Sequence, residues 1–180
     1  DSGVPHLRPN NIGFGELILD KLVFLPAEFV NLEKYSLKKG DVLFNNTNSK
    51  ELVGRAAVVV DDMSHGYSNH ITRVRVKENV LLPEWLSYSI NNLWLKGYFL
   101  KISTKWIGQA GVNNKALKSL KLPLPFKNGK PDLEEQKRIV AYLDKIAEKR
   151  KELLKLYGDS EIEIEEMKQS ILRKAFRGEL

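Results

Sequence analysis

The chain has 180 residues and a net charge of +6, which is long enough for one domain with its own core plus an extended element. It contains no cysteine, which excludes disulfides and thiolate metal sites and favours a reducing compartment. No apolar run approaches the roughly 18 residues that a membrane-spanning helix needs. The first residues include neither an initiator methionine nor an apolar signal segment, so we expect residues to be missing at the N-terminus.

The first half of the sequence predicts short strands joined by polar turns. We expect strands at residues 22–25, at the end of 36–44, at 55–60 and at 70–77. A polar loop over residues 45–49 lies between two of them. In the last strand Arg73, Arg75 and Lys77 alternate, which places them on one face.

Residues 83–125 predict a helix followed by a strand that leaves the domain. Pro83 is suited to the first turn of a helix, which we expect to run to about Phe99, and the exit strand spans residues 120–125. Residues 85–131 contain eight lysines, seven aromatic side chains and no acidic residue. One-sided positive charge is typical of proteins that bind polyanions. The alternative is a solvated lysine-rich surface over an aromatic core.

The sequence after Pro131 predicts a single long helix. Asp132 is suited to cap its N-terminus, Glu135 completes a capping box, and Arg177 followed by Gly178 predicts its end. Apolar residues at alternating spacings of three and four form a narrow seam, in which Arg150 and Ser160 are the polar members. The apolar seam residues are Ile139, Leu143, Ile146, Leu153, Tyr157, Ile164, Met167 and Ile171.

Two questions about this helix stay open at the level of sequence. Gly158 weakens it, and Ser160 with Glu163 would suit the start of a second helix, so a helical hairpin is the alternative to one continuous helix. We favour continuity because the seam keeps its phase across Gly158. The seam itself requires a partner helix, unless it packs against the body of this same chain.

These patterns predict an α+β fold. The expected arrangement is a curved mixed sheet with short helices over residues 1–125, a turn over 126–131 and a long coiled-coil helix over 132–180.

No arrangement of residues in the sequence is typical of catalysis. Gly13-Phe14-Gly15 lacks the third glycine of a dinucleotide loop, and the three histidines do not have the spacing of metal ligands. Asp132 and Glu135 lie within one capped helical turn, where acids serve as caps rather than as a nuclease metal site. We therefore expect a chain that is not itself an enzyme and holds no metal.

The sequence resembles the specificity subunit of type I restriction–modification systems. More narrowly, it resembles one target recognition domain of such a subunit followed by one conserved helix. The motifs that carry the resemblance are Gly3-Val4-Pro5, Arg8-Pro9-Asn10-Asn11-Ile12, Gly40-Asp41-Val42-Leu43-Phe44, Thr47-Asn48-Ser49, Glu51-Leu52-Val53-Gly54-Arg55, Gln109-Ala110-Gly111-Val112-Asn113, residues 120–125, Glu135-Gln136, Ile139-Val140 and residues 174–180. They extend over nearly the whole chain.

The resemblance implies sequence-specific binding of double-stranded DNA, which directs adenine methylation and cleavage to a bipartite site. It also implies a methyltransferase (modification) subunit and a restriction subunit as partners, antiparallel pairing of the long helices, and a cytoplasmic location in a prokaryote. The cofactors, S-adenosylmethionine and ATP with Mg, are then expected on those partner subunits. The chain is interpreted either as a half-length subunit that forms a homodimer or as a fragment of a two-domain subunit.

Base reading requires side chains that donate and accept hydrogen bonds in the groove. The candidates in this sequence are Asn46, Thr47, Asn48, Ser49, Arg55, Arg73, Arg75, Lys105, Gln109 and Asn113. Each has a structural alternative: residues 45–49 suit a plain turn, the two arginines of the last strand suit a solvated sheet face, and Gln109 and Asn113 suit a satisfied loop. His70 is interpreted as structural.

Two other functions remain as alternatives. The chain is either the recognition segment of a fused restriction–methylation enzyme, or an adaptor that displays a basic domain on a coiled coil and does not bind DNA.

Overall fold

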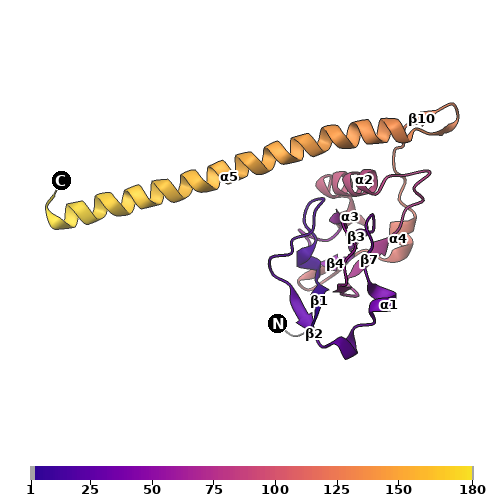
Figure 1. The fold of residues 1–180 in the computed structure, drawn as a ribbon, viewed down its shortest axis with the longest axis horizontal. Helices are drawn as coiled ribbons and strands as arrows, with labels where there is room; N and C mark the ends of the chain where they lie inside the picture. The colour runs from indigo at the N-terminus through magenta and orange to yellow at the C-terminus, as the bar shows by residue number, and fades with distance from the viewer. Residues whose placement is uncertain (1–2, 180) are drawn as a thin grey trace. The chain divides into compact units, whose positions relative to one another are not determined.

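The computed structural model describes residues 3–179, which divide into two compact units, Asp1–Lys137 and Arg138–Leu180. Figure 1 shows the elements along the chain. In order they are β1 (Val4–Leu7), η1 (Pro9–Asn11), β2 (Val23–Leu25), η2 (Ala27–Phe29), α1 (Leu32–Tyr35), β3 (Val42–Asn45), β4 (Thr47–Asn48), β5 (Ala56–Val58), β6 (Gly66–Tyr67), β7 (Ile71–Val74), α2 (Pro83–Leu95), α3 (Tyr98–Ile102), β8 (Thr104–Trp106), β9 (Gln109–Gly111), α4 (Asn114–Lys118), β10 (Phe126–Lys127), β11 (Lys130–Pro131) and α5 (Leu133–Arg177).

The strands within residues 3–179 form three sheets of three strands and one two-stranded ribbon. The strand orders are β2-β1-β6, β5-β3-β7, β4-β9-β8 and β10-β11, and every pairing is antiparallel except that of β1 with β6. The mixed α+β class expected from the sequence is confirmed. The strands have only two to four residues each, so they make several small sheets.

Several expected elements differ from the structure. The strand expected at residues 70–77 ends at Val74, so Arg75 and Lys77 lie beyond it, and β4 forms within the expected polar loop. Residues 120–125 form no strand, because prolines 123 and 125 have no N–H to donate to a sheet. The helix expected to run from Pro83 to about Phe99 is divided into α2 and α3 at Gly97, whose φ of +66° ends the first helix.

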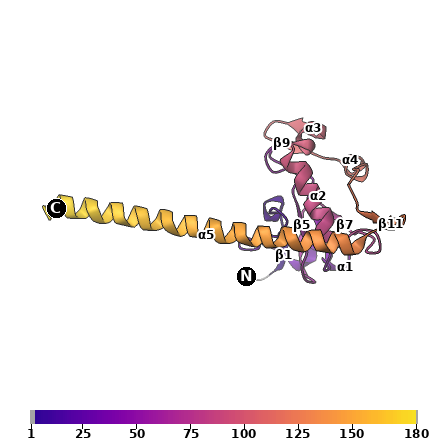
Figure 2. The same cartoon turned by 90° about the horizontal axis from the view of Figure 1, so that it is seen from above.

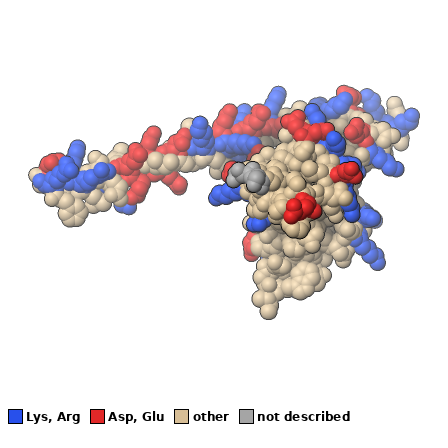
Figure 3. Space-filling model, turned by 60° about the horizontal axis from the view of Figure 1, so that its bottom comes forward, with Lys and Arg blue, Asp and Glu red and all other residues tan. Residues whose placement is uncertain are grey.

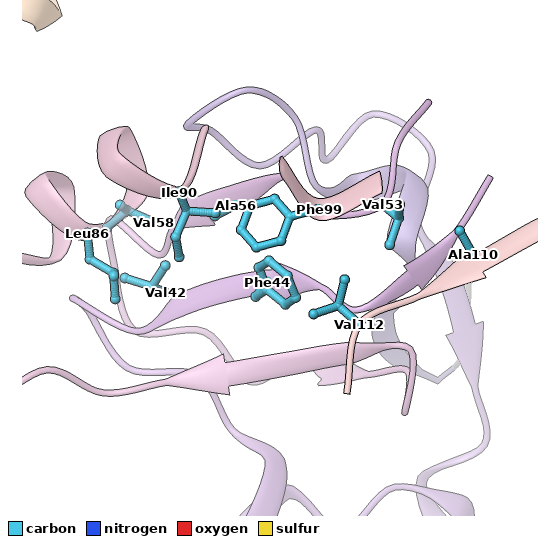
Figure 4. Close-up of a cluster of buried hydrophobic side chains, with 10 residues drawn as sticks. All are labelled: Val42, Phe44, Val53, Ala56, Val58, Leu86, Ile90, Phe99, Ala110 and Val112. Carbon is cyan, nitrogen blue, oxygen red and sulfur yellow. The ribbon is translucent and has the colours of Figure 1, made fainter. Parts of the chain in front are cut away.

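The main core lies between the β5-β3-β7 sheet and the helices α2 and α3 (Figure 4). All four residues of β3 are buried, as expected for a central strand covered on both faces. Leu86 and Ile90 project from α2 onto the sheet, while Phe99 projects from α3. The rings of Phe44 and Phe99 meet edge to face with centroids 5.2 Å apart, a favourable geometry for aromatic pairs.

Phe99 also packs against backbone. A Cβ placed on Gly54 would lie 2.4 Å from the Phe99 ring, and Gly54 has a φ of +95°. Both facts require glycine here, because only a residue without a Cβ allows this approach and this backbone conformation. In the structure Asn45 belongs to β3 and the polar loop spans residues 46–55, so the close approach connects α3 to the end of this loop.

Buried amides join the helices to neighbouring backbone. Asn91 of α2 accepts a hydrogen bond from Ala56 N (3.1 Å) and donates one to Ala56 O (2.8 Å), which couples α2 to β5. Gln136 is fully buried, accepts from Leu82 N (3.0 Å) and donates to Val80 O (3.0 Å). Buried polar groups need such partners, so the glutamine fixes the last residues of the first unit to the start of α2.

Within the second unit α5 continues without interruption through Gly158, so the expectation of one long helix is confirmed (Figure 2). The cap expected at its start is also present, since Asp132 Oδ1 accepts from Glu135 N at 3.0 Å. Six residues of the seam are between 47% and 70% exposed, namely Ile146, Leu153, Tyr157, Ile164, Met167 and Ile171.

Replacing Gly54 with alanine tests the packing of Phe99. We expect Gly54→Ala to lower the free energy of unfolding by about 2–5 kcal/mol, because strain at positive φ adds to a steric clash in the core. The matched control is Gly97→Ala, which has φ +66° but no atom within 4 Å of the new Cβ, so only about 1–2 kcal/mol should be lost. Urea unfolding followed by circular dichroism measures both. Equal losses would show that Phe99 moves aside.

Candidate nucleic-acid interface

The β4-β9-β8 sheet brings together four of the candidates. Thr47 and Asn48 form β4, which pairs with β9, where Gln109 begins the strand. Lys105 lies in β8 opposite Ala110. Lys105 and Gln109 are both exposed, so the structure places a cation and an amide on one solvent-facing hairpin.

Asn46 is the centre of a hydrogen-bond relay. Its Nδ2 donates to Asn69 O (3.1 Å) and to Thr72 Oγ1 (3.0 Å), and its Oδ1 accepts from Thr47 Oγ1 (2.8 Å). Thr72 Oγ1 in turn donates to Asn114 Oδ1 at 3.2 Å. The relay therefore joins the polar loop, β7 and the start of α4 across three parts of the sequence.

Two hollows open on either side of this relay and share Asn46 and Asn114. The first, of about 350 Å³, is lined by Tyr35, Asn46, Tyr67, Ser68, Asn69, Ile71, Thr72, Arg73 and Asn114. The second, of about 440 Å³, is lined by Asn46, Thr47, Thr104, Trp106, Gly111, Val112, Asn113 and Asn114. Neither lining contains a carboxylate, and amides, hydroxyls and aromatic rings predominate. Such a surface offers hydrogen bonds without repelling a phosphate backbone.

Two of the candidate arginines have partners inside the protein. Arg75 makes a bidentate contact with Asp41, with Nε to Oδ1 at 2.6 Å and Nη2 to Oδ2 at 3.1 Å. This hydrogen bonding raises the pKa of Arg75 above its ordinary value. Arg73 donates to Ser36 O (2.9 Å) and its Nε lies 4.0 Å from the same buried aspartate. Much of the positive charge on both arginines is therefore balanced within the fold.

Arg55 lies apart from the hairpin and packs on an aromatic side chain. Its guanidinium lies 4.4 Å from the ring centroid of Trp94, and burial lowers its pKa. The indole N–H of Trp94 donates to Glu51 O at 3.1 Å, which orients the ring. This cation–π contact places Arg55 beneath the end of the polar loop rather than in either hollow.

The remaining candidates serve local turns as well as lining the surface. Asn113 lines the second hollow and caps α4, since its Oδ1 accepts from Ala116 N at 2.8 Å. Asn48 Oδ1 accepts from the backbone N of Ser49 at 2.8 Å. The seam residues of the predicted dimerisation helix all lie in the second unit.

Most residues that line the hollows were not among the sequence candidates, and three of them bear on recognition: Thr72, Trp106 and Asn114. Thr72 reaches Asn46 only because β7 pairs with β3 in a register that sets Thr72 opposite Phe44. This is a long-range pairing that no local pattern reveals. Asn114 could have been predicted, because it directly follows the candidate Asn113 in the sequence.

The lysines of residues 85–131 differ from the arginines. None of the eight has an ion-pair or side-chain hydrogen-bond partner in the described part of the chain. Figure 3 shows one face of the molecule, on which basic side chains lie along the right-hand edge of the first unit and most of the remaining surface is uncharged. The unpaired ammonium groups are the charges available to an anionic partner.

Neither a metal site nor a membrane-spanning helix is found within residues 3–179. No group of three His, Asp or Glu side chains there could hold a metal ion. In the same residues no helix combines the length and the apolar character needed to cross a bilayer.

Burial lowers the pKa of both His6 and His65, which favours their neutral forms.

Comparison with known proteins identifies a family. Residues 25–163 match the profile described as the type I restriction modification DNA specificity domain. The specificity subunit of the StySPI type I enzyme of Salmonella potsdam is 30% identical over 82% of this chain and 31% of the relative. The EcoKI specificity subunit of Escherichia coli K12 is 27% identical over 100% of the chain and 38% of the relative.

Solved structures agree with this comparison. The HsdS subunit from Thermoanaerobacter tengcongensis matches with a TM-score of 0.58 and 26% identity, over 99% of this chain and 38% of that one. A chain from a study of the assembly and conformational transition of the type I R-M system matches with a TM-score of 0.68 and 25% identity, over 100% and 40%. The chain spans about a third of the length of its curated relatives. It belongs to the type I restriction–modification specificity family, whose domain recognises DNA sequence.

Proposed function

We propose that this chain reads one half of a bipartite DNA site and thereby directs adenine methylation and cleavage by partner subunits. The observation that carries the proposal is the pair of hollows lined by amides and hydroxyls, with the exposed Lys105 on the β8-β9 hairpin, in a domain of this family. The chain itself catalyses no step. A methyltransferase subunit and a restriction subunit bind S-adenosylmethionine, ATP and Mg. We infer that the complex acts in the cytoplasm of a prokaryote, as membership of this family implies.

A base-resolution map of DNA methylation tests this function. The intact reading frame is expressed with its neighbouring methyltransferase gene in a host that has no adenine methylation. We expect a new bipartite adenine-methylation motif that disappears when the present chain is deleted. The absence of any motif, with both proteins present and folded, would contradict the proposal and favour an adaptor that does not bind DNA.

Lys105 provides a test of phosphate contacts. Because each neutralised phosphate releases counterions, Lys105→Ala should weaken binding to all duplexes and reduce the slope of log K against log salt by about 1. Fluorescence anisotropy over a salt series measures this slope for the complex with its methyltransferase subunit. The matched control is Lys21→Ala, an exposed lysine in the loop before β2. A slope that matches the wild type would remove Lys105 from the phosphate contacts.

The same proposal includes a homodimer formed through α5. The helix has a narrow apolar seam with many charged residues outside it, and Figure 3 shows acidic and basic side chains along its visible length. A single helix cannot bury such a seam on itself, so a second helix is required.

The polar members of the seam favour one register for this dimer. In an antiparallel pair centred on residue 155, Arg150 faces Ser160 of the second copy, Leu153 faces Tyr157, and Ile146 faces Ile164. The same register sets Lys149 beside Glu163 and pairs α5 along its full length, since residue 155 is the midpoint of Leu133–Arg177. A shift of one heptad would set Arg150 against Met167, and a parallel pair would set Arg150 against itself. Polar seam residues usually fix register in this way.

Cysteine cross-linking tests the register without interference, because the chain has no native cysteine. We expect the double variant Ile146→Cys/Ile164→Cys to form a covalent dimer on oxidation, since facing seam positions approach within the reach of a disulfide. The matched control is Ile146→Cys/Ile171→Cys, which is positioned to cross-link in the register shifted by one heptad. Non-reducing electrophoresis separates the outcomes. Stronger cross-linking of the control, or a monomer in both variants, would contradict the proposed dimer.

A further inference from the structure

The relay that ends at Asn114 determines which way its amide points. Asn69 O can only accept a hydrogen bond, so the atom of Asn46 that contacts it must be the nitrogen. In the structure Asn46 Nδ2 also donates to Thr72 Oγ1, and the single hydroxyl proton of Thr72 is directed to Asn114 Oδ1. Asn114 thus presents its oxygen to Thr72, while its Nδ2 has no partner in the described residues. Because Asn114 is exposed and lines both hollows, this NH₂ group is a donor available to a ligand.

An aromatic ring is held in place in the second hollow. The indole of Trp106 lies across Gly111, where an added Cβ would be 2.8 Å from its Cζ3 and 3.1 Å from its Cη2. The ring therefore rests on backbone that has no side chain, and the residue remains 55% exposed. The second hollow accordingly combines an oriented amide donor with an apolar ring, and no charged residue lines it.

These two features match one base better than the others. In the major groove thymine presents an acceptor, O4, beside an apolar C5-methyl group, whereas guanine presents acceptors without a methyl group. Cytosine presents an amino donor, which needs an acceptor, and adenine presents an acceptor, N7, beside an amino donor but has no methyl group. We infer that this hollow reads a thymine, with Asn114 Nδ2 donating to O4 and Trp106 contacting the methyl group. The inference rests on the proposed function, because it requires the first unit to bind duplex DNA.

Base-analogue binding tests the inference on the complex of this chain with its methyltransferase subunit. Each thymine of the mapped motif is replaced in turn by deoxyuridine, which lacks the methyl group and keeps O4. We expect one thymine in each half-site at which deoxyuridine weakens wild-type binding about four-fold, the contribution of one buried methyl group. In Trp106→Ala the same replacement should have no effect.

Substitutions in the relay test whether Asn114 is the hydrogen-bond donor to the base. Asn114→Ala should reduce binding on the order of ten-fold and relax the preference at that same base pair. Thr72→Val keeps the shape of the side chain and should relax the same preference, because the amide of Asn114 is then free to rotate. Asn92→Ala, an exposed asparagine of α2 that lines neither hollow, is the matched control and should leave the preference unchanged. In each of these variants the slope of log K against log salt should remain at its wild-type value.

The results separate this inference from the proposed function. If no motif depends on this chain, the proposed function fails. If the motif is present but no thymine in it is sensitive to loss of its methyl group, the inference alone is overturned. A wild-type base preference in both Asn114→Ala and Thr72→Val, with lower affinity for every sequence, would also overturn it, since that result describes a structural role.

Discussion

The contact between Gly54 and the ring of Phe99 is the constraint on which the arrangement of the first unit depends. Phe99 fills the space that a side chain at position 54 would take, and it also packs on Phe44 in the central strand. One ring thus joins α3, β3 and the end of the polar loop. Gly54 N donates to Asn45 O at 2.9 Å, so the same position closes the base of that loop. The loop can carry polar side chains on its outer surface because its ends are fixed in the core.

Polar side chains on this surface are oriented first by a backbone group and then by one another. An amide can turn over with little change of shape, so a row of asparagines alone has no defined pattern of donors and acceptors. In this protein the carbonyl of Asn69 removes that freedom from Asn46, and the order then passes through Thr72 to Asn114. A recognition surface with a defined donor can therefore be built from uncharged residues.

Much of the fold could be predicted from sequence because its signals are local. The cap at Asp132, the seam through Gly158 and the apolar run of β3 each depend on neighbours in the chain, and each has its counterpart in the structure. The candidate surface was predicted only in part. Asn46 and Asn113 were visible as polar residues in turns, whereas Thr72 and Trp106 acquire their positions from strand pairing and from packing on Gly111. Such long-range relations leave no periodic pattern in the sequence.

The number of basic residues in the sequence does not distinguish the cations that stabilise the fold from those that remain available to a ligand. Arg73 and Arg75 share the buried carboxylate of Asp41, and Arg55 packs on Trp94, so each guanidinium already has a partner. Removing Arg75 would take the bidentate partner from the buried Asp41 as well as remove a charge. The lysines of residues 85–131 have no such partners among residues 3–179, so their charges remain available to a ligand. We therefore expect the proposed attraction of this domain for a polyanion to depend on its lysines, while its arginines stabilise the fold.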